Sequence, residues 1–249
     1  MQTNEVGVDQ AIEQSPVHSR ELAALAGQHR RRHLERGQCE TIRVWQPDAG
    51  TWCYQTHIAI TGQPLERLAW LADVFYNAAA LASYPWYPQF AGGRCQALEQ
   101  ATPGGIARHQ LCWGRFDLGL SALRYYRQLV SLAQPDDRTA VIAARSVHQG
   151  PALPEDALLT YTVAPNGEVL HFGDGCLHWH HICCTTGAGL LPGRLDRWLI
   201  NGLRWLRLDQ AERKTYRQEA EMLNDWLQST TPVVDYAADV PLAPAGASQ

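Results

Sequence analysis

A series of short strand-like segments followed by one long helical pattern is the feature that most limits how this chain can fold. Between residues 94 and 184, turn-forming breaks such as QPDD, APNGE and GDG separate apolar and β-branched segments. From residue 191 to 228, leucines instead recur every three or four positions, and Pro192 is placed to open a helix. Strands joined by short breaks pair in antiparallel fashion, so the sequence predicts an antiparallel sheet and a long terminal helix.

The two elements together predict the architecture. An antiparallel sheet of this length must curl, and its concave face needs a cover. The long helix is the element large enough to supply that cover. We therefore predict an α+β fold in which a curved antiparallel sheet grips a long C-terminal α-helix. The space between a sheet and a helix packed in this way commonly holds an apolar ligand.

The N-terminal part of the chain adds two strands and two helices. Residues 41–60 are typical of two strands around a PDAG turn, and residues 62–84 have the spacing of a helix that stops at the prolines of PWYP. Residues 19–37 predict an extra helix with four arginines in its second half, after a loose terminus over residues 1–18. The arginines suit either a solvated face or a patch for anionic headgroups or an acidic partner.

Composition limits the function classes. Apolar residues make up 45% and charged residues 18% of the chain, which is enough for a sizeable core. The formal net charge of −4 gives no reason to expect nucleic acid as a partner. No cationic residue followed by an apolar segment opens the sequence, so we expect no secretory leader, and no apolar run has the length of a membrane span. With seven scattered cysteines, we expect a cytoplasmic protein with reduced thiols.

The order of elements, together with three local segments, resembles the START domain superfamily with its helix-grip fold. YPWYP at 84–88 is similar to a Trp-containing segment of that family, and DDRTAVIAARSV at 136–147 to its Arg-containing strand. TTGAGLLPGRLDRWLINGL at 185–203 is similar to its Gly-rich turn before the last helix. Where family members often have an acidic residue before that turn, this chain has Thr185 and Thr186.

The resemblance covers about residues 50–228 and implies binding, and often transfer, of one hydrophobic molecule in an internal cavity. Some family members are instead cyclases or dehydratases of a bound polyketide. We accordingly divide the chain into an N-terminal extension with a basic helix (1–40), a START-like helix-grip domain (41–228) and a flexible tail (229–249).

The segment GDGCLHWHHICC, residues 173–184, concentrates reactive side chains. If it is a strand, alternation puts Cys176, His178, His180, Ile182 and Cys184 on one face, and Leu177, Trp179, His181 and Cys183 on the other. The sequence does not show which of these two faces points toward the covering helix. The segment has no CxxC or HxxxH pair, and further ligands would have to come from other strands, such as His109 or His171. We expect neither a metal nor a cofactor.

Catalytic candidates follow from an inward-facing histidine. His178 or His180 in an apolar cavity would serve as a general base, and Asp174 would orient the imidazole. The alternative is that these are sheet residues whose hydrogen bonds are satisfied. The candidate ligand-binding set comprises aromatic, cationic and imidazole side chains: Trp86, Tyr126, Arg145, His178, His180, Trp198 and Trp205.

Three functions remain open from the residues. The first is a binding protein, and possibly a carrier, for a lipid, sterol-like compound, isoprenoid or polyketide, with transient contact to a membrane surface. The second is a cyclase or dehydratase with a cavity histidine as base. The third is an interaction module that uses the arginine-rich helix of residues 19–37.

Overall fold

The computed structural model describes residues 5–34, 40–48, 51–77, 90–99, 105–117, 123–150, 158–159, 161–162, 164–186, 218, 221–223 and 225–229. The helices are α1 (Val8–Leu34) and α2 (Arg67–Tyr76), with further helical residues at 221–223 and 225–229, here called the terminal segment. The strands are β1 (Glu40–Asp48), β2 (Thr51–Thr61), β3 (Phe90–Leu98), β4 (Ile106–Asp117), β5 (Leu123–Asp136), β6 (Thr139–Ser146), β7 (Leu158–Leu159), β8 (Tyr161–Thr162), β9 (Gly167–Gly173) and β10 (Cys176–Thr186).

Within the described residues, all ten strands belong to one sheet, as the breaks in the sequence predict. The strand order is β1-β2-β10-β9-β6-β5-β4-β3, and every neighbouring pair along this path is antiparallel. The two short strands lie off the path, β7 parallel to β5 and β8 antiparallel to β10. The last strand therefore returns to lie beside the first hairpin of the chain.

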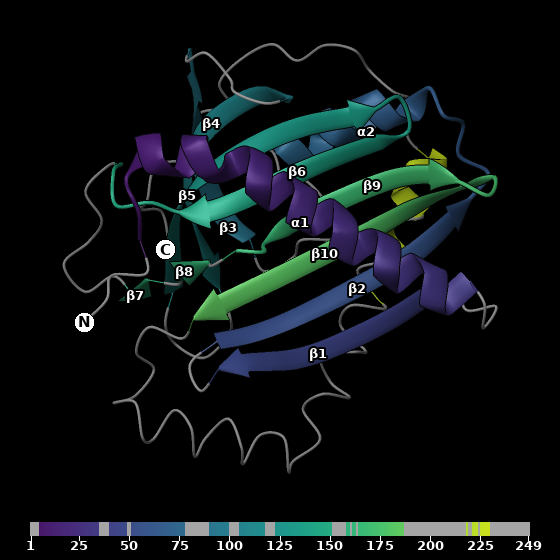
Figure 1. Cartoon of the computed structure of the whole chain (residues 1–249), viewed down its shortest axis with the longest axis horizontal. Coiled ribbons are helices and arrows are strands. Elements are labelled where there is room, and N and C mark those ends of the chain that lie inside the picture. Colours follow the sequence, from purple (N-terminus) through teal and green to yellow (C-terminus); the bar gives the residue numbers. More distant parts are fainter. Residues whose placement is uncertain are drawn as a thin grey trace, which may run out of the picture.

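Helices cover the sheet on both faces (Figure 1). α1 crosses one face, called here the outer face, while α2 and the terminal segment lie on the opposite, inner face. Of the predicted long C-terminal helix, the terminal segment is helical, and residues 191–217 lie outside the described residues. No helix in the described part of the chain is both long enough and apolar enough to cross a bilayer.

Strand alternation sorts the core into two apolar layers. In β6, Ala140 and Ile142 join the inner cluster with α2, whereas Val141 and Ala143 join the outer cluster with α1. Full burial of a leucine-sized side chain contributes about 1.5–3 kcal/mol, so both layers contribute to stability. The central strands are consequently fixed by apolar contacts on each side.

α1 begins at Val8, so the expectation of a loose terminus over residues 1–18 is wrong for residues 8–18. Side chains at helical spacing pack α1 on the sheet: Ala11, Ser15, Ser19, Leu22 and Ala26 are all buried. Two of these five are serines, and Pro16 lies inside the helix, so the buried stripe has little apolar periodicity to detect.

The residues just before α1 are also attached to the sheet. Val6 pairs with Val147 in a parallel bridge, and Glu5 forms an ion pair with Arg127 at 3.0 Å. Both contacts fix the entry to α1 on the outer face.

A cross-strand disulfide joins Cys53 of β2 to Cys184 of β10, so the expectation of reduced thiols is wrong for this pair. The register places the two residues directly opposite each other, with their Cα atoms 4.1 Å apart. They are 131 residues apart in the sequence, so only the return of β10 to β2 brings them together.

A glycine is required where β9 meets β6. Gly167 has a φ of 151°, and a Cβ there would lie 1.9 Å from the carbonyl oxygen of Ile142. Gly27 in α1 is the contrasting case, because a Cβ at that position would meet nothing within 4 Å.

We predict that Gly167→Ala lowers the free energy of unfolding by roughly 2–4 kcal/mol, because it adds backbone strain and a clash. Gly27→Ala should raise stability by up to about 1 kcal/mol, since alanine is the better helix former. Urea denaturation of both variants measures the difference. Equal stability of the two variants would contradict the β6–β9 geometry.

Candidate functional site

The structure shows which face of β10 looks toward α2. Leu177 and Trp179 belong to the inner cluster, and Ile182 belongs to the outer cluster under α1. By alternation, His181 and Cys183 share the inner face with Trp179. The inner face is therefore the one that carries these two reactive side chains.

A carboxylate on the neighbouring strand connects the polar groups of this face. Glu168 of β9 lies opposite His181 in the register, and its two carboxylate oxygens have different partners. The indole Nε1 of Trp179 donates to Glu168 Oε2 at 2.5 Å, and His181 Nδ1 forms a hydrogen bond and ion pair with Oε1. With the Glu168 side chain only 9% exposed, this arrangement satisfies a carboxylate that is otherwise costly to bury.

His181 carries a positive charge over an extended pH range. Burial by itself lowers its pKa, but the Glu168 carboxylate and a hydrogen bond with Cys183 raise that pKa well above the ordinary 6.5. The histidine is thus a hydrogen-bond donor at neutral pH, held between a carboxylate and a thiol. Such a group suits the recognition of an oxygen acceptor better than the removal of a proton.

The polar groups continue toward the end of β10. Ser146 Oγ lies 3.2 Å from Thr162 Oγ1, and Gln128 Nε2 donates to the same oxygen at 3.2 Å. Thr162 pairs with Thr185, two residues after Cys183. We call this row the polar strip, which comprises Glu168, His181, Cys183, Thr162, Ser146 and Gln128.

An apolar region adjoins the polar strip. Phe75 of α2 lies against Trp179 with ring centroids 5.4 Å apart, and Leu71, Leu170 and Leu177 are buried around them. The inner face therefore combines a large apolar area with a few polar groups at one end.

Tyr126, one of the candidate ligand-binding residues, does lie on the inner face. It is buried, and burial together with nearby Cys112 and Cys95 raises its pKa well above the ordinary value, so the hydroxyl stays neutral. A Cβ on Gly114, its cross-strand partner, would lie 2.6 Å from the hydroxyl oxygen. Glycine at this position thus makes room for the phenol.

His178 and His180 lie on the outer face, with the side chains of His57 and Ile182, rather than on the face that α2 covers. His57 Nε2 is 3.0 Å from His178 Nδ1, and the ring of His57 stacks on that of His180 with centroids 4.2 Å apart. His178 Nε2 lies 3.2 Å from the Gly173 carbonyl oxygen, which can only accept. His178 therefore donates through Nε2, and its Nδ1 accepts from His57 when both rings are neutral.

The other candidate residues do not gather around these histidines. Arg145 is also on the outer face, where its Nη1 lies 2.9 Å from Nε2 of His18 in α1. Asp174 is exposed in the β9–β10 turn, where it and Gly175 have φ angles of 55° and 73°, as a type I′ turn requires. Three further candidates lie outside the described residues: Trp86, Trp198 and Trp205.

Among the described residues, no cluster of three or more His, Cys, Asp or Glu side chains is arranged to hold a metal ion. The histidines of the outer face are joined to each other by ring contacts and a hydrogen bond.

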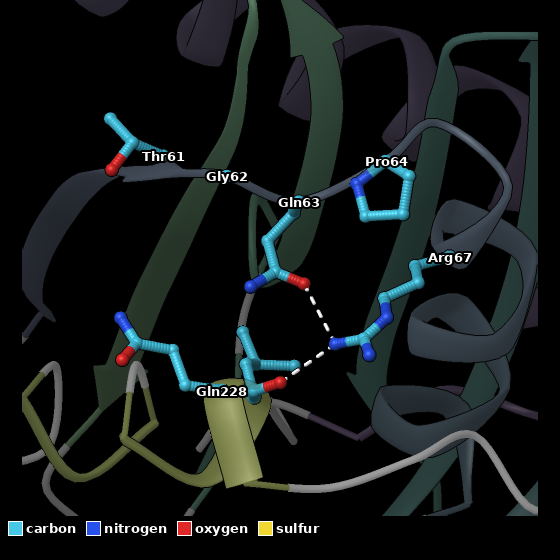
Figure 2. Close-up of a pocket in the computed structure, with 7 residues that line it drawn as sticks. Thr61, Gly62, Gln63, Pro64, Arg67 and Gln228 are labelled. Atoms are coloured by element: carbon cyan, nitrogen blue, oxygen red, sulfur yellow. Dashed lines mark hydrogen bonds between the residues drawn. The ribbon is translucent and has the colours of Figure 1, made fainter.

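A surface pocket of about 440 Å³ opens where the end of β2, the start of α2 and the terminal segment meet (Figure 2). Arg67 Nη1 donates to the Leu227 carbonyl oxygen at 2.7 Å and to Gln63 Oε1 at 2.9 Å. The last carbonyls of a helix lack partners within it, and Arg67 satisfies one of them. Trp70 of α2 also stacks on Trp226, with centroids 5.2 Å apart. The pocket thus borders the junction that attaches the terminal segment to α2.

The similarity of this chain to known proteins lies in its structure and not in its sequence. No family model matches the sequence, and no curated protein matches it significantly. The lipid transfer and protein localization domain of human StarD13 is similar in structure, with a TM-score of 0.52 at 11% identity, covering 78% of this chain and 86% of that one.

Two further solved structures resemble the chain at lower scores. Human StAR-related lipid transfer protein 5 gives a TM-score of 0.48 at 12% identity, covering 82% of this chain and 97% of that one. A fragment of a STAR-related lipid transfer protein from Xanthomonas axonopodis gives 0.47 at 11% identity, covering 66% and 85%. The likeness to the StarD13 domain shows that the chain has the START-like helix-grip fold, which confirms the predicted fold class.

We predict that Glu168→Gln lowers the pKa of His181 relative to the native protein, because the carboxylate no longer opposes the effect of burial. In the native protein the folded-state pKa exceeds the unfolded one. The ion pair therefore stabilises the fold at low pH, and this contribution is lost as pH rises through the raised pKa. At neutral pH the variant should lose roughly 1–3 kcal/mol of stability.

NMR titration of isotope-labelled histidine measures the pKa directly. Asp174→Asn is the matched control, since it removes an exposed carboxylate from the turn between the same two strands. A His181 pKa that stays raised in Glu168→Gln would contradict the ion pair.

Proposed function

We propose that the protein binds one hydrophobic small molecule between the inner face of the sheet and the helices that cover it. The observation that carries the proposal is the composition of this face, where an apolar area around Trp179 and Phe75 adjoins the polar strip. Ligand sites are typically apolar with a few placed polar groups that set orientation. The similar StarD13 structure is a lipid transfer and protein localization domain, which supports the same class of ligand.

The polar strip gives the ligand its orientation in this proposal. His181, held protonated by Glu168, presents a positive charge to a carbonyl, hydroxyl or carboxylate oxygen of the ligand. The apolar part of the ligand lies toward Trp179 and Leu177, where burial contributes roughly 25 cal/mol per Å² before ordering costs. A lipid, a sterol-like compound, an isoprenoid and a polyketide all have this combination of one oxygen-bearing end and an apolar body.

The internal cavity and the transfer of the ligand to or from a membrane surface remain predictions. The binding site extends in this proposal to Trp86, Trp198 and Trp205, which lie outside the described residues. Tyr126 contributes a neutral hydroxyl on the same face. The interaction role of the arginine-rich stretch within residues 19–37 also stays a prediction.

The cyclase or dehydratase alternative stays a prediction as well, and the position of its candidate bases does not support it. His178 and His180 lie on the outer face, and Asp174 is exposed in a turn. On the described part of the inner face the histidine is His181, which the Glu168 carboxylate keeps protonated and therefore unsuited to act as a base.

Native mass spectrometry and organic extraction of the protein purified from its own host test the proposal. We expect one apolar molecule per chain, and binding of a fluorescent fatty acid once that molecule is removed. In Ala144→Phe, which enlarges a half-buried inner-face residue, we expect binding to weaken at least tenfold.

Ala107→Phe is the matched control, because Ala107 is exposed on β4 and the same substitution there leaves the inner face unchanged. Thermal melts check that both variants fold. Absence of any co-purifying molecule, together with failure to bind a panel of fatty acids, sterols and isoprenoids, would refute the proposal.

A further inference from the structure

The inner face carries a thiol, an imidazole and a carboxylate in series. Glu168 on β9 is bonded to His181 on β10, and His181 is hydrogen-bonded to Cys183, two residues further along the same face. A nucleophile beside an imidazole that a third group orients is the arrangement by which proteins activate cysteine. Nothing in the binding function proposed above requires the thiol.

We propose that Cys183 is a nucleophile that accepts an acyl group from an activated acyl chain, a thioester or ester, bound on the inner face. This inference rests on the proposed function, because the same apolar area holds the acyl chain. Along β10 the inner-face residues run Leu177, Trp179, His181, Cys183, so the apolar positions precede the reactive pair. An acyl chain over Leu177 and Trp179 has its carbonyl at His181 and the thiol beyond it.

The reaction is an acyl transfer between two sulfur atoms, or from oxygen to sulfur. The Cys183 thiol gives its proton to solvent, and its Sγ then forms a bond to the carbonyl carbon of the ligand beside the His181 imidazolium. The tetrahedral intermediate collapses as the bond from that carbon to the leaving sulfur or oxygen breaks. His181 gives its proton to the leaving group, which departs as a free thiol or alcohol, and Cys183 is left as a thioester.

The surroundings of the thiol fit this role. The thiolate is the nucleophilic form of cysteine, and the Glu168 carboxylate holds a cationic imidazole beside Cys183. Cys183 is half-buried, so a ligand on the inner face can reach it.

The other described cysteines lack such a setting. Cys53 and Cys184 are joined in a disulfide. Burial and the neighbouring Cys95, whose Sγ lies 2.6 Å away, raise the pKa of Cys112 well above its ordinary value. Cys176 is also half-buried and on β10, but on the opposite face, which makes it the matched control.

The test uses the full chain and p-nitrophenyl octanoate, whose nitrophenolate release is followed by absorbance. We expect a burst of about one equivalent, an intact mass increased by one octanoyl group, and peptide mapping of that group to Cys183. Cys183→Ala should abolish the burst, and Cys176→Ala should leave it unchanged. Glu168→Gln should slow it by roughly 100-fold, since positioned acid–base groups contribute about that much or more.

Two outcomes would overturn the inference: a burst that persists in Cys183→Ala, or an acyl group spread over Cys176 and other nucleophilic side chains at the rate of free thiols. Binding of a fluorescent fatty acid is measured in parallel on the native chain and on Cys183→Ala, with melting temperatures to confirm folding. Binding without acylation would refute the nucleophile and leave the proposed binding function intact. Loss of both in the folded native chain would refute both.

Discussion

The pairing of β10 with β2 on one edge and β9 on the other is the constraint on which the rest of the structure depends. This register puts Trp179 and His181 beside Glu168, Cys184 opposite Cys53, and His180 opposite His57. A slip of one residue would exchange the two faces of β10. His178 and His180 would then lie under α2, and Leu177 and Trp179 would lie under α1. The contacts on both faces of the strand oppose that slip, because each face has partners suited to it.

The two faces use polar residues in different ways. On the outer face, His57, His178 and His180 bond and stack with one another beneath α1, so they fill space in a layer that needs no ligand. On the inner face, Glu168 and His181 form an ion pair at the edge of an apolar area. Buried charges require compensation, and here each partner compensates the other. The contrast supports the proposal that the inner face is the site of recognition, whereas the outer face is part of the core.

The sequence predicted the fold well, because strand alternation and helical spacing are local properties. The antiparallel sheet, α2 and the two faces of residues 176–184 all follow from such patterns. Which face of the sheet is the inner one did not follow from these patterns, because it depends on which helix lies over which side of the sheet. His181 and Cys183 were visible as one face of the strand, but their partner Glu168 is identified only by the β9–β10 register. The first half of α1 was missed because its buried stripe includes Ser15 and Ser19.

The disulfide between Cys53 and Cys184 makes a closed covalent ring of most of the sheet. The two cysteines are 131 residues apart in the sequence, and the ring contains every strand from β3 to β9. In the chain-entropy model, closing a loop of this size in the unfolded state stabilises the native state by about 5 kcal/mol. A protease that cuts the backbone once inside the ring leaves two pieces still bonded through sulfur. The cut protein would therefore migrate as one molecule on a denaturing gel until a reductant separates the fragments.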